Sequence, residues 1–448
     1  MVRADDEHYQ ALHRTALRGY SYKALPASVR AKARLLLLDT IGCIVSGRSA
    51  GPVIGFERAF AELDQGDFSF PHGPALTVSA AASVAAMASA WDEGCEGLPY
   101  AHGRPGLALI GSLLPIAVTR RISTERLLTA LIAGYEIGAR AGGWLRIGPG
   151  LHVDGNWPAL GVAAGVCHLL ELSAAQTWNA ISLVACQLPA SLYLPIRSGD
   201  DGRNTYPSHA ASLGLQAALA SAAGISAPSE ALAEYARDHA RPDGRPAPAD
   251  DRWFILECYF KPHAGVRHAH YGLEAALRIR ERLSRTTQSI RAARLRIYPE
   301  ASVYAGNRDP QAPITAQFSL SLGVAAGLRF GSMDPDLFRS ATLQDAELRR
   351  LERLVVIEAD PTLGHDRQRA AILRVETDDA VFEERIDILD GDPLHPLDAH
   401  RLIEKFVRYS RASIDEEGAR AFAHALIEAE QPGGFDVLWR MLSNTPDR

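Results

Sequence analysis

A succession of helices rich in small side chains most limits the folds open to this chain. Residues 6–240 follow helical spacing almost throughout, and alanine, serine and glycine dominate three stretches, at 76–91, 158–170 and 209–223. Small residues let helix backbones approach closely, and no fixed repeat period relates the three stretches. The pattern therefore predicts a compact helical bundle rather than an array of repeats.

The spacing of apolar residues changes after a loop rich in proline, aspartate and glycine at 242–251. Runs with the character of strands follow, with helical segments among them at 314–329 and 334–343. The predicted strands are 289–298, 353–359, 371–376 and 381–386, and the last two flank a hairpin turn at 377–380. Helical spacing resumes after the Gly-Asp-Pro sequence at 391–393.

These patterns predict a mainly α protein with a smaller α+β domain. We expect a large helical bundle at residues 1–268, an inserted α+β lid domain at 269–392, and C-terminal helices that return to the bundle at 393–448. Ligand sites occur preferentially at domain boundaries, so a site is expected where the two domains meet.

The composition excludes several classes of protein. Of 448 residues, 47% are hydrophobic and 22% are charged, and the net charge is −6, whereas nucleic-acid binders usually carry a basic field. The longest apolar stretches, at 75–91 and 106–119, are shorter than a membrane span. The polar amino terminus shows no signal peptide and the five cysteines lack CxxC spacing, which favours a cytoplasmic protein without structural zinc.

A basic stretch coincides with the predicted domain boundary. Pro262 disfavours helix at Lys261, so we expect Lys261 on a turn at the entrance of the next helix. Helical spacing predicts a helix from Val266 onward. If that helix began near Pro262, it would place His263, Arg267 and His270 on one face, where they would suit an anionic small molecule. A solvated basic turn is the alternative interpretation.

Other familiar motifs are missing from the sequence. It contains no GxSxG sequence, no Walker sequence and no dinucleotide fingerprint after a strand. His268 and His270 have the HxH spacing of some metal sites, but the helical pattern there puts their rings on different faces. We therefore expect no metal ion.

Carboxylates follow the helix at 76–91 directly. Asp92 and Glu93 lie at its carboxyl end, where the helix dipole disfavours negative charge, so they need a partner or a task. His102 follows in the same segment. The alternative is a polar loop surface.

Three further places combine polar residues with a boundary position. His152 and Asp154 lie in a glycine-bounded loop before the helix at 158–170, and Arg203 precedes the helix at 209–223. The planar guanidinium of Arg203 is suited to hold a carboxylate. Tyr304 lies in a loop predicted to be irregular, at 298–307. The structural alternatives are a solvated histidine, surface pairing of Arg203 with neighbouring aspartates, and a packing tyrosine.

Taken together, the order and spacing of these segments resemble the MmgE/PrpD family, which contains 2-methylcitrate dehydratase, cis-aconitate decarboxylase and iminodisuccinate epimerase. The resemblance covers nearly the whole chain and rests on the following segments: Leu25-Pro26 with LLDTIGC up to Gly47, 148–164, 210–224, Lys261-Pro262 with His270, PITAQFSL at 313–320, and GDPLHPL. It implies a helical domain with an α+β lid and usually a homodimer. It also implies no metal or organic cofactor and a site between the domains for small di- or tricarboxylates.

The resemblance also suggests site residues. The acid before an HPG-like turn falls on Asp92 or Glu93, and the histidine of that turn falls on His102. The loop histidine falls on His152, and the lysine at the lid boundary falls on Lys261.

Several positions depart from the family pattern. Arg203 replaces a lysine, and a guanidinium does not exchange protons near neutral pH. Asp154 replaces a threonine, and Val266 replaces a histidine of decarboxylase-like members. The usual acid-rich run is reduced to Asp92 and Glu93. These differences weaken a direct transfer of any one family reaction.

The family reactions share a step that creates or quenches negative charge on carbon next to a carboxylate. We expect Lys261, with a pKa lowered in a partly dry cleft, to act as the base. The residues expected in catalysis are Lys261, His102, His152, Asp92 and Tyr304. The residues expected to bind substrate are Arg203, Arg267, Glu93, Asp154 and His270.

The predicted function is that of a cofactor-independent lyase, a dehydratase or decarboxylase of a small di- or tricarboxylic acid. The first alternative is an epimerase of an iminodisuccinate-like compound, which would need acid/base groups on opposite sides of the carbon. The second alternative is a member of the family that binds a ligand without catalysis.

Overall fold

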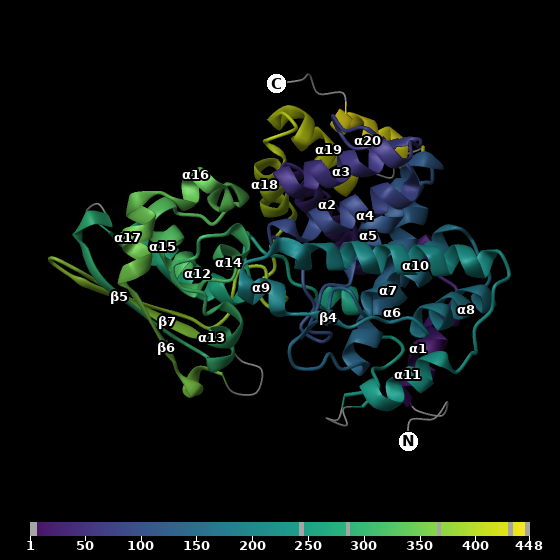
Figure 1. Ribbon diagram of the computed structural model, residues 1–448, viewed down its shortest axis with the longest axis horizontal. Helices are drawn as coiled ribbons and strands as arrows, with labels where there is room; N and C mark the ends of the chain where they lie inside the picture. Colours follow the sequence, from purple (N-terminus) through teal and green to yellow (C-terminus); the bar gives the residue numbers. More distant parts are fainter. Residues whose placement is uncertain (1–6, 242–245, 284–286, 365–368, 429–432, 444–448) are drawn as a thin grey trace.

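The computed structural model describes residues 7–241, 246–283, 287–364, 369–428 and 433–443. Buried apolar side chains form two main cores, one in the helical part and one in the α+β part. The two parts lie side by side along the long axis of the molecule (Figure 1). The prediction of a mainly α protein with a smaller α+β part is confirmed.

Six helices form the centre of the helical part. They are α2 (Ala27–Arg48), α4 (Val78–Trp91), α5 (Gly106–Thr119), α6 (Thr124–Trp144), α7 (Pro158–Leu169) and α10 (Tyr206–Ala222). An added Cβ at Gly134 of α6 would lie 2.6 Å from the carbonyl oxygen of Gly161 of α7, so only glycine fits there. The small residues in the sequence thus allow these helices to pack backbone against backbone.

Shorter elements complete the helical part. They are α1 (Glu7–Leu17), α3 (Gly51–Leu63), α8 (Ala174–Ala185), α9 (Leu194–Ser198), α11 (Ala231–His239) and the two-residue strands β1 (Phe68–Ser69), β2 (Ala75–Leu76), β3 (Leu151–His152) and β4 (Ser191–Leu192). Strand β1 pairs with β2, and β3 pairs with β4. The β3–β4 pairing fixes the loop that carries His152.

The end of the chain returns to the helical part. Helices α18 (Ala399–Ser410), α19 (Glu416–Glu428) and α20 (Phe435–Ser443) lie against α2 and α5 (Figure 1). Their side chains Phe406, Phe422 and Phe435 are buried in the core of the helical part.

A four-stranded sheet in the order β6-β5-β7-β8 organises the α+β part. Strand β5 (Ile290–Ile297) pairs in parallel with β6 (Val355–Ala359) and antiparallel with β7 (Ala371–Thr377), which pairs antiparallel with β8 (Val381–Ile386). Helices α12 (Arg267–Arg282), α15 (Leu320–Phe330) and α17 (Ala346–Leu354) pack on the apolar face of this sheet. All four predicted strands are confirmed.

Several helical details differ from the sequence prediction. The helix predicted at 314–329 is divided into α14 (Pro313–Gln317) and α15, because the Ser319 side chain accepts a hydrogen bond from the amide of Leu322 and caps α15. The segment 334–343 forms a 3-10 turn (Pro335–Phe338) and then α16 (Ser340–Leu343). Helix α17 was not predicted.

One prediction near the domain boundary is wrong, and another is confirmed. The loop expected to be irregular at 298–307 contains helix α13 (Pro299–Ala305), with Pro299 at its first position. The helix predicted from Val266 onward is α12, which begins at Arg267 with Val266 as its N-cap. It does not extend back to Pro262, since Gly265 has a φ of +82° and Val266 is extended. His263 therefore does not share a helical face with Arg267 and His270.

The predicted domain boundaries at 268/269 and 392/393 stay predictions, and the first of them falls in the opening turn of α12. Within the described residues, no helix combines the length and the apolar character that a membrane crossing requires.

Candidate active site

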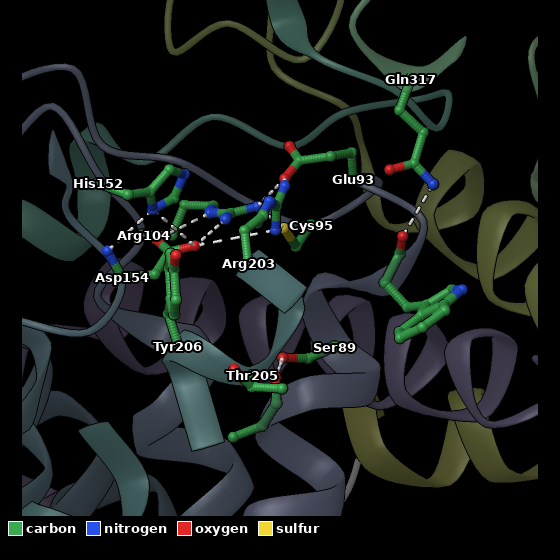
Figure 2. Close-up of polar contacts among 12 residues, drawn as sticks. Ser89, Glu93, Cys95, Arg104, His152, Asp154, Arg203, Thr205, Tyr206 and Gln317 are labelled. Atoms are coloured by element: carbon green, nitrogen blue, oxygen red, sulfur yellow. Dashed lines mark hydrogen bonds and ion pairs between the residues drawn. The ribbon is translucent and has the colours of Figure 1, made fainter. Parts of the chain in front are cut away.

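Five charged side chains from separate segments meet in the interior, close to the α+β part. Three are cations and two are carboxylates, and each is at most 8% exposed. They are Glu93, Arg104, Asp154, Arg203 and Lys261. Figure 2 shows four of them pointing toward one another. We call these five residues the charge cluster.

Glu93 lies at the middle of the charge cluster. It follows α4 and its C-cap Asp92, and its φ of +53° turns the side chain away from the helix axis. Its carboxylate accepts hydrogen bonds from Arg104 Nη1 at 2.6 Å and Lys261 Nζ at 3.1 Å, and it also pairs with Arg203. One carboxylate therefore meets three cations.

Lys261 is 3% exposed and lies on a turn, as the sequence predicts. Besides the Glu93 carboxylate, its ammonium donates to the carbonyl oxygens of Glu93 at 2.6 Å and Gly265 at 3.3 Å. Burial lowers the pKa of Lys261, which raises the fraction of neutral amine near neutral pH. The amine has thus the environment of a base.

Arg104 is the residue of the charge cluster that the sequence analysis missed. It precedes Pro105 and α5, and it joins the two acids by donating to Glu93 and to Asp154. It also donates to Cys95 Sγ at 3.2 Å. The side chain of His102, two residues earlier, is exposed. A signal was present, because Arg104 is a cation between the carboxylates at 92–96 and the apolar stretch at 106–119.

His152 and Asp154, which belong to the same loop, are in contact. The backbone amide of Asp154 donates to His152 Nδ1 at 3.3 Å, so the neutral ring carries its proton on Nε2. Burial lowers the pKa of His152, although the Asp154 carboxylate at 3.7 Å opposes this shift. Burial also raises the pKa of Asp154, but attraction to Arg104 and His152 outweighs burial and holds it below its usual range.

Arg203 is completely buried in the 3-10 turn Asp201–Thr205 before α10. It contacts Glu93, and its Nη1 lies 4.0 Å from Asp154, so surface pairing with the exposed neighbouring aspartates does not occur. Nη2 makes the pair with Glu93, whereas among the described residues the Nε and Nη1 atoms have no acceptor in hydrogen-bonding geometry. Burial lowers the pKa of Arg203 to about 9, so it remains a cation at neutral pH.

Asp92 lies outside the charge cluster. Its carboxylate accepts from Ser46 Oγ at 2.7 Å and from Arg339 Nη1 at 3.3 Å. Burial raises the pKa of Asp92, and the charge of Arg339 opposes this. The charge of Arg339 thus compensates the carboxylate of Asp92 at the carboxyl end of α4. Because Arg339 belongs to the α+β part, this pair joins the two parts of the molecule.

Three other predicted residues also have partners of their own. Arg267 pairs with Asp392 and lies 3.6 Å from the centre of the Tyr259 ring. His270 Nε2 is 2.9 Å from the carbonyl oxygen of Ala264. Tyr304 is 42% exposed. These side chains line the domain boundary without joining the charge cluster. Within the described ranges, no group of three or more His, Cys, Asp or Glu side chains is arranged to hold a metal ion.

Comparison with protein families decides the assignment. The MmgE/PrpD N-terminal domain matches residues 15–237, and the MmgE/PrpD C-terminal domain matches residues 263–429. The chain belongs to the MmgE/PrpD family. Lys261 lies in the interval between the two matches, just before the second begins. Membership in this family indicates an enzyme of the dehydratase or lyase type or a related one. No curated protein matches the chain.

Proposed function

We propose that this MmgE/PrpD protein is a cofactor-independent lyase, a dehydratase or decarboxylase, that acts on a small di- or tricarboxylic acid. The observation that carries the proposal is Arg203. This buried guanidinium pairs with Glu93 through Nη2 only, and its remaining N–H groups at Nε and Nη1 are suited to a further carboxylate. This partly satisfied cation belongs to the same charge cluster as Lys261.

The charge of the cluster supports an anionic ligand. Three cations and two carboxylates leave one positive charge in a region that excludes water, and an isolated buried charge is costly. A carboxylate of the ligand, bound at Arg203, would balance that charge. This arrangement provides local attraction for an acid on a protein whose net charge is −6.

The acid/base groups fit an elimination. The excess positive charge belongs to the resting cluster, with Lys261 protonated. Once Lys261 has released one proton to solvent, its neutral amine would take a proton from the carbon next to the bound carboxylate, and the electron pair would form the double bond. Lys261 would pass that proton to the departing hydroxide, which leaves as water, while the Nε2–H of neutral His152 donates a hydrogen bond to the departing oxygen. In a decarboxylation, the pair left behind by CO2 would take up a proton from the same groups. The proton inventory balances in both reactions.

An epimerase is the second candidate, because of one feature of the cluster. Lys261 and His152 lie at opposite ends of a chain of contacts that runs through Glu93, Arg104 and Asp154. Groups at opposite ends can remove a proton from one face of a carbon and return one to the other. The homodimer and the lack of a cofactor that the family resemblance implies stay predictions.

Proton NMR in D2O tests the proposal with citrate, 2-methylcitrate, cis-aconitate, malate and iminodisuccinate. A lyase produces new vinyl signals or loses CO2, and the reacting acid identifies the substrate. Deuterium entering the α-position without a change in composition indicates an epimerase. If no acid on this panel changes, the proposed substrate class is wrong and a binding role is favoured.

A further inference from the structure

The loop that carries Glu93 is held in an unfavourable conformation. A φ of +53° is uncommon and unfavourable for a residue other than glycine. Such a conformation persists only where the surroundings fix it. In this loop, two lysine side chains donate hydrogen bonds to consecutive backbone carbonyl oxygens: Lys261 to that of Glu93 and Lys405 to that of Gly94.

The second lysine comes from the far end of the sequence. Lys405 of α18 is 2% exposed, and its ammonium donates to Asp39 Oδ1 of α2 at 2.5 Å and to the carbonyl oxygen of Gly94 at 2.7 Å. Asp39 is 3% exposed. The buried Lys405–Asp39 pair is thus balanced in charge, and one of its hydrogen bonds is directed at the loop.

Helix α18 also limits the loop sterically. A Cβ added at Gly94 would lie 2.6 Å from the hydroxyl oxygen of Tyr409, one turn after Lys405. Lys405 Nζ lies 5.0 Å from the centre of the same ring. The peptide that follows Glu93 is therefore enclosed by α18 and has little freedom to rotate.

We infer that Lys405 is a positioning residue, which through Asp39 and the Gly94 carbonyl fixes the loop so that Glu93 faces Arg104, Arg203 and Lys261. This inference rests on the proposed function of the charge cluster and assigns the C-terminal helix a part in it. A pair that served stability alone would not need a bond to this loop. Buried ion pairs often contribute little net stability, which makes a role in geometry the better explanation.

The test compares the double variant Asp39→Asn/Lys405→Met with the wild type. Changing both partners avoids leaving Asp39 as an unpaired buried charge. Amide hydrogen exchange, followed by mass spectrometry, is measured for the peptide that contains residues 92–97. We expect exchange there to rise about tenfold, which corresponds to the loss of one hydrogen bond to a charged group.

Arg34→Met is the matched control. Arg34 of α2 is, like Lys405, a buried cation. It donates to the carbonyl oxygen of Leu426 on α19 at 2.7 Å without contacting the loop. Its removal weakens the same attachment of the C-terminal helices. We expect exchange in 92–97 to remain at the wild-type rate in this variant.

Turnover of the acid identified by NMR gives the second readout. In the double variant kcat falls about tenfold or more, and the acidic limb of its pH profile moves to lower pH, because a displaced Glu93 no longer stabilises protonated Lys261. If the wild type turns over no acid, the proposed function fails, while the exchange result still decides whether Lys405 positions the loop.

Unchanged exchange in 92–97, or an equal rise in Arg34→Met, would overturn the inference. If the double variant does not fold, Lys405→Arg replaces it. That variant keeps the charge opposite Asp39 but changes the geometry of the donor to the Gly94 carbonyl oxygen, and a rise of about threefold confined to the same peptide is then expected. An unchanged rate in a folded Lys405→Arg protein would likewise overturn the inference.

Discussion

Two neighbouring regions of the molecule collect basic side chains, but only one of them leaves charge unbalanced. In the opening turn of α12, Arg267 pairs with Asp392, and His270 contacts the Ala264 carbonyl oxygen. In the charge cluster, three cations share two carboxylates. The difference teaches that basic composition does not identify a ligand site, whereas excess buried charge does. An unused donor alone is not sufficient, because Arg267 Nη1 also lacks an acceptor in hydrogen-bonding geometry.

The largest expected effect comes from removing the base. Lys261→Met keeps the apolar stem and lacks the amine, so we expect turnover of the identified acid to fall about 1,000-fold. The far-UV circular dichroism spectrum should remain that of the wild type. If this variant retained more than about a tenth of the wild-type rate, Lys261 would not be the base, and the charge cluster would not be the catalytic region.

Removing one arginine from each region separates the two roles. Arg203→Met should lower kcat/KM about 100-fold, since a charge-assisted bond to the substrate carboxylate is lost, while the unfolding temperature stays level or rises. Arg267→Met should lower the stability of the protein and leave its activity nearly unchanged. It deprives Asp392 of its partner and costs about 2 kcal/mol of unfolding free energy, with kcat/KM changed less than about threefold.

Steady-state kinetics and urea unfolding on both arginine variants supply the measurements. If Arg267→Met lost as much activity as Arg203→Met at equal stability, the opening turn of α12 would belong to the substrate site, as the sequence first suggested.

A second pair of variants asks whether Arg104 or His102 belongs to the site. Arg104→Met removes the link between Glu93 and Asp154, and we expect a loss of turnover of about 100-fold. The His102 side chain is exposed, so His102→Ala should change turnover less than about threefold. The opposite order of effects would restore His102 to catalysis.

The smallest expected effect concerns pH and the histidines of α12. Burial lowers the pKa of His268 to about 3, well below the ordinary value near 6.5. Between these two pH values, His268 is protonated in the unfolded state and neutral in the native state. The free energy of unfolding therefore falls as pH drops from 6.5 toward 3. Between pH 6.5 and 5.0 the wild type should lose about 1 to 2 kcal/mol more than His268→Gln in urea unfolding. Equal losses would show that His268 titrates normally.

Much of the fold follows from the sequence because its periodicities are strong. The small-residue helices and all four strands stand where alternation and spacing predict them, and the family resemblance extends over the same segments. The helix start at Arg267 lies within one residue of the predicted start at Val266, whereas the positive φ of Gly265, which keeps His263 off the helix, follows from no spacing rule.

The candidate site was predictable only in part. Lys261, Glu93, Asp154 and Arg203 were all singled out, since each interrupts an apolar pattern at a helix end or loop. The sequence predicts a catalytic histidine at His102, but the charge cluster uses Arg104, two residues later in the same loop. Tertiary contacts such as Arg267 with Asp392 join residues 125 positions apart and leave no local signal.

The most direct test of the central claim is a calorimetric titration of the wild type, Arg203→Met and Arg267→Met with the acid that the NMR panel identifies. The account predicts that the wild type and Arg267→Met bind it with affinities within about threefold of each other, and that Arg203→Met binds it about 100-fold more weakly. Wild-type affinity in Arg203→Met would contradict the claim that the charge cluster holds the substrate carboxylate.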